Sequence, residues 1–201
     1  MVGARRSERA VRAGILLILL AKTLPVTAED GCFPPEAALD DFRADWYCKN
    51  LKAAELRQLG AGPTYRFIYL PTFHAPRFVT VAMEPDVPVV RGVVLSGRGG
   101  YEPGKVAKAT RRVLTQGEWQ LLQQRLDNAG IWEPPDTDDR PGTDGSRWVL
   151  EGRDSTRYRL HDLWSPKRAR FPQYVKACMY MLDLAGIRSE AEELSAYGLR
   201  E

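Results

Sequence analysis

The sequence predicts an α+β domain, an antiparallel sheet of about six strands with about three helices packed on it. Short segments of alternating apolar and polar residues come in pairs with turn-forming residues between them, which is typical of antiparallel strands. Other segments repeat apolar residues at helical spacing, and the order is helix, two strand pairs, helix, strand pair, helix. We assign residues 29–188 to this single domain, 1–28 to a signal peptide and 189–201 to a polar tail.

The N-terminal segment has the three parts of a secretory signal peptide. Arginines precede a short apolar run from Ala13 to Ala21, and small residues close the segment at Ala28. Because the run is too short to span a bilayer as a helix, we expect cleavage after Ala28 and no stable membrane insertion. Because Lys22 directly follows the apolar run, an uncleaved membrane anchor is the alternative. The expected location is periplasmic or secreted.

Removal of the signal peptide changes the charge balance. The chain holds 29 Lys and Arg against 26 Asp and Glu, and residues 1–28 contain five of the basic residues and one acidic residue. The remaining 24 basic and 25 acidic residues give no electrostatic reason to expect nucleic acid as a partner. An unknown protein or a small anionic ligand is the expected partner.

The three cysteines are Cys32, Cys48 and Cys178. In an oxidising compartment, one disulfide and one free thiol is the simplest accounting. Cys32 with Cys48 and Cys48 with Cys178 are both conceivable pairs, and the sequence does not choose between them. Cys178 lies on the apolar stripe of a predicted helix, where a free thiol behaves as a small hydrophobic group.

The first half of the domain shows one helical pattern followed by strands. Leu39, Phe42 and Trp46 recur at i, i+3 and i+7 and predict an amphipathic helix within residues 34–51. Alternation then predicts strands at 64–70 and 77–83, joined by a proline-bounded hairpin loop, and a third strand at 87–96.

Residues 96–105, SGRGGYEPGK, contain most of the phosphate-binding pattern G-x-x-x-x-G-K. A phosphate-binding loop needs a helix and a Ser or Thr directly after the lysine, but Val106 follows here and begins a segment with strand periodicity. We therefore expect 97–104 to connect two antiparallel strands, with glycines in turn conformations and no nucleotide contact at Lys105. The next helix begins at the capping box Thr115–Glu118.

The second half of the domain repeats the same kinds of element. A helix at 116–129 ends at Gly130 and is followed by a polar loop, EPPDTDDRPGTDG, at 133–145. Strands at 146–152 and 157–164 form the last pair. The final helix lies within 171–187 and has an apolar stripe, made of Phe171, Val175, Cys178 and Leu182.

Four motifs occur in a characteristic order, YRFIYLPTFHAPRFVTV, GRGGYEPGK, TDGSRWVLEG and YRLHDLWSP. In these motifs the chain resembles a family of uncharacterised exported bacterial proteins, from Tyr65 to Pro166. The resemblance implies export and carries no reaction with it. This chain departs from the family pattern at His161 and Leu163, where an aliphatic and a basic residue are expected.

The last strand pair carries the candidate catalytic residues Glu151, His161 and Asp162. If the tryptophan-bearing face of the first strand is the core face, alternation points Glu151 outward. Glu151 then forms either an acid/base couple with His161 or an ordinary pair with Arg159 or His161 on a solvated sheet face, and the ordinary pair is favoured. Asp162 is expected to accept backbone or tyrosine hydrogen bonds near the strand end.

Metal-binding spacings do not occur. His74 and His161 are the two histidines, and no C-x-x-C, H-x-x-H or H-E-x-x-H motif is present, so we expect neither a metal site nor a cofactor. The candidate binding residues lie in the glycine-rich loop, because binding residues concentrate on loops that a rigid sheet supports. They are Arg98, Tyr101 and Lys105.

These observations favour a non-enzymatic binding or interaction domain, because no complete catalytic constellation is present. A hydrolase-like enzyme that uses Glu151, Asp162 and His161 is one alternative. An immunity or inhibitor-type protein is another, and it rests on the acidic loop at 133–145.

Overall fold

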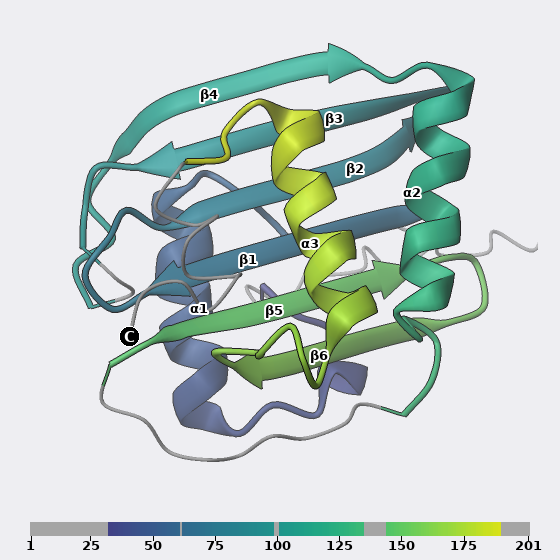
Figure 1. Ribbon diagram of the computed structural model, residues 1–201. Coiled ribbons are helices and arrows are strands. Elements are labelled where there is room, and N and C mark those ends of the chain that lie inside the picture. Colours follow the sequence, from purple (N-terminus) through teal and green to yellow (C-terminus); the bar gives the residue numbers. More distant parts are fainter. Residues whose placement is uncertain (1–31, 61, 99–100, 135–143, 190–201) are drawn as a thin grey trace, which may run out of the picture.

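The computed structural model describes residues 32–60, 62–98, 101–134 and 144–189 (Figure 1). Within them lie one antiparallel sheet of six strands, three α-helices and a short 3-10 helix, so the predicted fold class is confirmed. The strand order is β4-β3-β2-β1-β5-β6. The elements are η1 (Pro35–Ala37), α1 (Asp41–Ala53), β1 (Thr64–Pro71), β2 (Arg77–Glu84), β3 (Val87–Leu95), β4 (Val106–Val113), α2 (Gln116–Asn128), β5 (Ser146–Arg153), β6 (Tyr158–Trp164) and α3 (Pro172–Ala185).

Helices cover both faces of the sheet. In Figure 1, α2 and α3 lie in front of the strands and α1 lies behind them. The central strand β1 is buried along its whole length, with Tyr65 and Phe67 in the core under α2 and α3. Ile68 and Leu70 point to the second core, which contains Tyr47 of α1. The fold therefore has three layers and two apolar cores.

The first helix turns a different face to the sheet from the one predicted. Asp40 caps α1 by accepting a hydrogen bond from the backbone N–H of Arg43 at 2.8 Å, so Leu39 lies before the helix. Tyr47 and Leu51 are fully buried, whereas Phe42 is 76% exposed. Of the predicted stripe, only Phe42 fails to reach the core, because Leu39 and Trp46 pack partly buried against it. Tyr47 and Leu51, a second i, i+4 stripe, make the fully buried contact.

The connections around α2 follow the sequence pattern. Thr115 and Glu118 form the predicted capping box, in which the Glu118 N–H donates to Thr115 Oγ1 at 3.2 Å and the Thr115 N–H donates to the Glu118 carboxylate at 2.8 Å. Helix α3 ends at Gly186, whose φ of 64° lies in the left-handed region that favours glycine.

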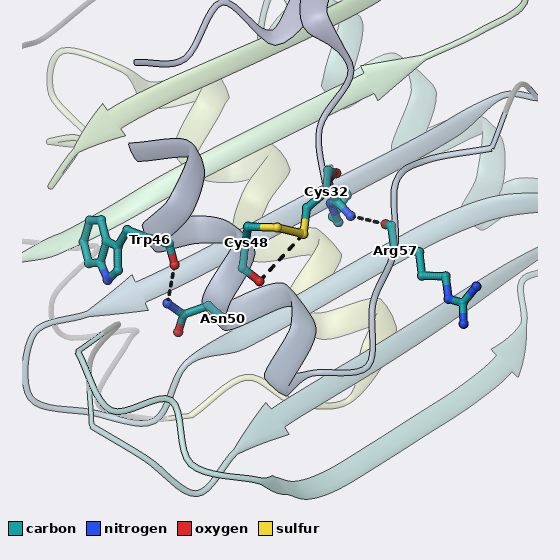
Figure 2. The surroundings of a disulfide bond; sticks show 6 residues. Cys32, Trp46, Cys48, Asn50 and Arg57 are labelled. Carbon is teal, nitrogen blue, oxygen red and sulfur yellow. Dashed lines mark hydrogen bonds between the residues drawn. A yellow bond between two sulfur atoms is a disulfide. The ribbon is translucent and has the colours of Figure 1, made fainter. Parts of the chain in front are cut away.

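A disulfide joins Cys32 to Cys48, with a Cα–Cα distance of 5.4 Å (Figure 2). Of the two predicted pairings, Cys48 with Cys178 is therefore wrong, because Cys178 lies in the other core, under α3. Burial raises the pKa of the free Cys178 thiol well above its ordinary value, as expected of a small hydrophobic group.

Three predicted segments lie outside the described residues. They are the signal peptide, residues 135–143 of the acidic loop and residues 190–201 of the tail.

Candidate functional site

The glycine-rich loop connects β3 to β4, as predicted. The Ser96 N–H donates to the Lys105 carbonyl at 2.8 Å, and the Arg98 N–H donates to the Glu102 carbonyl at 3.0 Å. These bonds continue the antiparallel pairing of β3 and β4 into the loop. A strand follows Lys105, so the loop lacks the helix N-terminus on which a phosphate-binding loop depends.

Two glycines in this loop have steric roles. A Cβ atom on Gly97 would lie 1.7 Å from the Glu102 carbonyl oxygen, so only glycine lets the two halves of the loop approach this closely. Gly104 has a φ of 74°, the left-handed turn conformation predicted for this loop. The path of the backbone in this loop therefore explains why both positions are glycine.

A line of three aromatic side chains, the aromatic row, runs from α1 onto this loop and consists of the exposed Phe42 and Tyr101 with the partly buried Trp46 between them. The ring centroids of Phe42 and Trp46 are 6.4 Å apart, and those of Trp46 and Tyr101 are 6.0 Å apart. Phe42 is 76% exposed and Tyr101 is 67% exposed. The Lys49 ammonium donates to the Tyr101 carbonyl at 2.9 Å, which fastens the loop to the helix. Contiguous exposed aromatic groups are typical of interaction sites.

The sequence pattern pointed to only one member of this row as a binding residue. Phe42 and Trp46 are one helical turn apart, and a core role was predicted for both. Because Tyr47 and Leu51 face the sheet, Phe42 points away from it. Trp46 packs partly buried against the second core, and Figure 2 shows its ring projecting away from the disulfide. The competing Tyr47–Leu51 stripe was the signal that could have revealed them.

Basic side chains occur on the two elements that carry the aromatic row. Lys49 follows Trp46 by three positions on α1, and the exposed Arg98 and Lys105 stand in the two arms of the loop that carries Tyr101. The predicted binding residues Arg98, Tyr101 and Lys105 thus belong to one exposed loop. The structure adds aromatic surface and a further cation from α1 to them.

Glu151 was predicted to lie on a solvated face of the sheet. It is instead fully buried. It stands opposite Arg66 in the β1–β5 register, and the Arg66 Nε–H donates to its carboxylate. The Tyr158 hydroxyl donates to the same carboxylate at 2.7 Å, and burial together with the Glu151 charge raises the pKa of Tyr158. The prediction was wrong because both faces of β5 are covered.

His161 lies on the opposite face of the sheet from Glu151. In the β5–β6 register His161 stands opposite Leu150, whereas Glu151 stands opposite Leu160. His161 Nε2 is 3.0 Å from the Ile131 carbonyl oxygen, and burial lowers the pKa of its imidazole, which favours a neutral ring that donates from Nε2. Glu151 and His161 therefore do not meet, as an acid/base couple would require.

Asp162 joins α1 to the sheet. Its carboxylate accepts a hydrogen bond from the Tyr47 hydroxyl at 2.7 Å and from Arg43 and Arg147 at 3.3 Å each. Burial and the Asp162 charge together raise the pKa of Tyr47. The tyrosine hydrogen bond predicted for Asp162 is thus present, and it holds α1 in the orientation that exposes Phe42.

No group of three or more His, Cys, Asp or Glu side chains in the described parts of the chain is arranged to hold a metal ion. Over the same ranges, no helix has both the length and the apolar character needed to cross a bilayer. Comparisons with protein-family models and with curated proteins find no match to the chain. The family resemblance of the four sequence motifs therefore stays a prediction.

Proposed function

We propose that the protein is an exported, non-enzymatic binding domain that recognises a protein partner through the aromatic row and the β3–β4 loop. The observation that carries this proposal is the contact of Tyr101 with Trp46. It joins a loop and a helix from distant parts of the sequence into one aromatic surface, of which Phe42 and Tyr101 are exposed. Exposed aromatic side chains of this kind supply most of the binding energy at protein interfaces.

The charges around the row indicate the chemistry of the partner. Lys49, Arg98 and Lys105 are exposed cations, and Lys49 is held beside the row by its bond to the Tyr101 carbonyl. A partner segment that presents an apolar side chain to Trp46 and carboxylates around it would match this surface. The aromatic centre would supply affinity, and the cations would guide the partner into register.

Export is part of the proposal and has its own support. The N-terminal segment has the pattern of a signal peptide, and the Cys32–Cys48 disulfide is compatible with an oxidising compartment. N-terminal sequencing of the protein recovered from the envelope or the medium tests this part. A chain that begins at Glu29 agrees with it, and a cytoplasmic chain that retains residues 1–28 refutes it.

Site-specific photo-crosslinking in the producing cells tests the binding surface. Tyr101→p-benzoylphenylalanine is expected to give a discrete cross-linked product, and adding Phe42→Ala should reduce its yield. The matched control places the same photoreactive residue at Lys52, an exposed position on α1. If position 101 gives no product, or position 52 gives the same one, the surface is not the binding site.

An affinity measurement with the captured partner gives the contribution of Tyr101 to the binding free energy. An aromatic residue at the centre of an interface contributes about 2 kcal/mol, so Tyr101→Ala should weaken binding roughly 30-fold. Turnover of a substrate by the purified protein in a hydrolase screen would instead favour an enzyme.

A further inference from the structure

Residues of α2 and α3 line a groove of about 500 Å³. These two helices lie on the opposite side of the sheet from α1 (Figure 1). Its apolar lining comes from both helices and includes Leu121, Val175 and Met179. The volume lies within the range of small-molecule sites. Because the helices are 13 and 14 residues long, the groove is at most about 20 Å long, which suits a small ligand.

The groove has an excess of positive charge. Its lining holds one carboxylate, Asp183, and four cationic side chains, namely Arg125, Arg168, Lys176 and Arg188. Arg188 bonds to Asp183 at 2.9 and 3.0 Å, so the carboxylate is matched by one cation. Amide side chains able to donate hydrogen bonds complete the polar lining, namely Gln124, Asn128 and Gln173.

The surroundings of the Arg125 side chain are a second observation about the groove. Its guanidinium lies 4.5 Å from the centroid of the Tyr180 ring, which fixes the side chain against α3. The Arg125 Nε–H is buried and finds no hydrogen-bond acceptor among the described residues. Buried donors are nearly always paired in proteins, so a water molecule or an anion in the groove would satisfy this group.

We propose that the groove binds a small anion that carries phosphate or carboxylate groups. Arg125 and Lys176 contact the charged groups, and Tyr180 holds the Arg125 guanidinium in place. The apolar lining takes up the uncharged part of the ligand. This site is separate from the aromatic row, which runs from α1 onto the β3–β4 loop, so it goes beyond the proposed partner-binding function.

Isothermal titration calorimetry of the intact mature chain with pyrophosphate and with citrate tests the site. Measurement at physiological ionic strength screens weak surface attraction. At least one probe is expected to bind with a Kd of about 1 mM or tighter. The two probes distinguish a phosphate ligand from a carboxylate ligand.

Three variants test the residues. Arg125→Gln should weaken binding by about tenfold or more, because it removes charge-assisted hydrogen bonds. Lys176→Gln changes an exposed side chain and should also weaken binding without affecting the fold. Lys52→Gln removes the same charge from α1, outside the groove, and should leave binding unchanged.

Two results would overturn the proposal. One is the absence of binding heat with both probes at 10 mM, a concentration about tenfold above the expected Kd. The other is an equal loss of affinity in Lys52→Gln and Lys176→Gln, which would show that net charge alone attracts the probe. Cross-linking at Tyr101 reports on the other surface, so the two proposals can fail independently.

Discussion

The buried Arg66–Glu151 ion pair leads to a quantitative prediction about stability. The Arg66 side chain is 1% exposed and that of Glu151 is fully buried. Glu151→Gln keeps the size of the side chain and an oxygen that can accept from Arg66, but it removes the negative charge. Arg66 keeps two further acceptors, the carbonyls of Arg57 and Cys32 at 2.6 and 3.4 Å. Its charge would nevertheless remain without a buried counterion.

Removing one partner of a buried ion pair costs about 3–5 kcal/mol. Because the carbonyl acceptors remain, we expect the lower end, about 3 kcal/mol, for Glu151→Gln. In a domain of this size, such a loss lowers the melting temperature by about 6–12 °C. Urea unfolding followed by circular dichroism measures the free energy directly.

Asp154→Asn is the matched control, since it makes the same change in a carboxylate that pairs with the exposed Arg157. It should cost less stability than Glu151→Gln, because solvent screens an exposed ion pair. The double variant Arg66→Met, Glu151→Leu removes both charges but leaves the Tyr158 hydroxyl without its acceptor, so it should recover part of the stability that Glu151→Gln loses. If Glu151→Gln costs no more than Asp154→Asn, the reasoning about the buried charge is wrong.

The disulfide and the buried histidine give two further predictions. Replacing Cys32 and Cys48 with alanine should lower the unfolding free energy by about 3 kcal/mol, and in urea titrations a reductant should destabilise the parent protein but not this variant. Burial lowers the pKa of His161 below its ordinary value of 6.5, so the stability it contributes is present above pH 6.5 and is lost as the pH falls from 6.5 towards the folded-state pKa. The glutamine side chain of His161→Gln can still donate to the Ile131 carbonyl. Between pH 7.5 and 5.0, the unfolding free energy of this variant should fall less than that of the parent protein. An equal fall in the two proteins would contradict this prediction.

The fold could be predicted from the sequence because its signals are local. Strand alternation and the Thr115–Glu118 capping box depend on neighbouring residues, and each produced the element it predicted. The face that α1 turns to the sheet could not be chosen, because the Phe42–Trp46 and Tyr47–Leu51 stripes are both apolar. Tertiary packing decided between them.

Burial of Glu151 and assembly of the site depend on contacts between distant residues. Alternation shows which residues share a face of β5, but not that α1 and the segment around Cys32 cover the second face. The Trp46–Tyr101 contact likewise joins parts of the chain that no sequence pattern links. The candidate residues on the loop could be predicted, whereas their aromatic neighbours on α1 could not.

The position of Cys32 couples the redox state of the chain to its electrostatics. The Cys32 carbonyl accepts a hydrogen bond from the buried Arg66, so the disulfide that ties this residue to α1 also holds an acceptor beside the Arg66–Glu151 pair. In a reducing cytoplasm the segment lacks this tie, and the two charges are solvated at lower cost. For the exported protein that we propose, the precursor would therefore unfold more easily before translocation, and oxidation afterwards would secure the native state in the compartment where it acts.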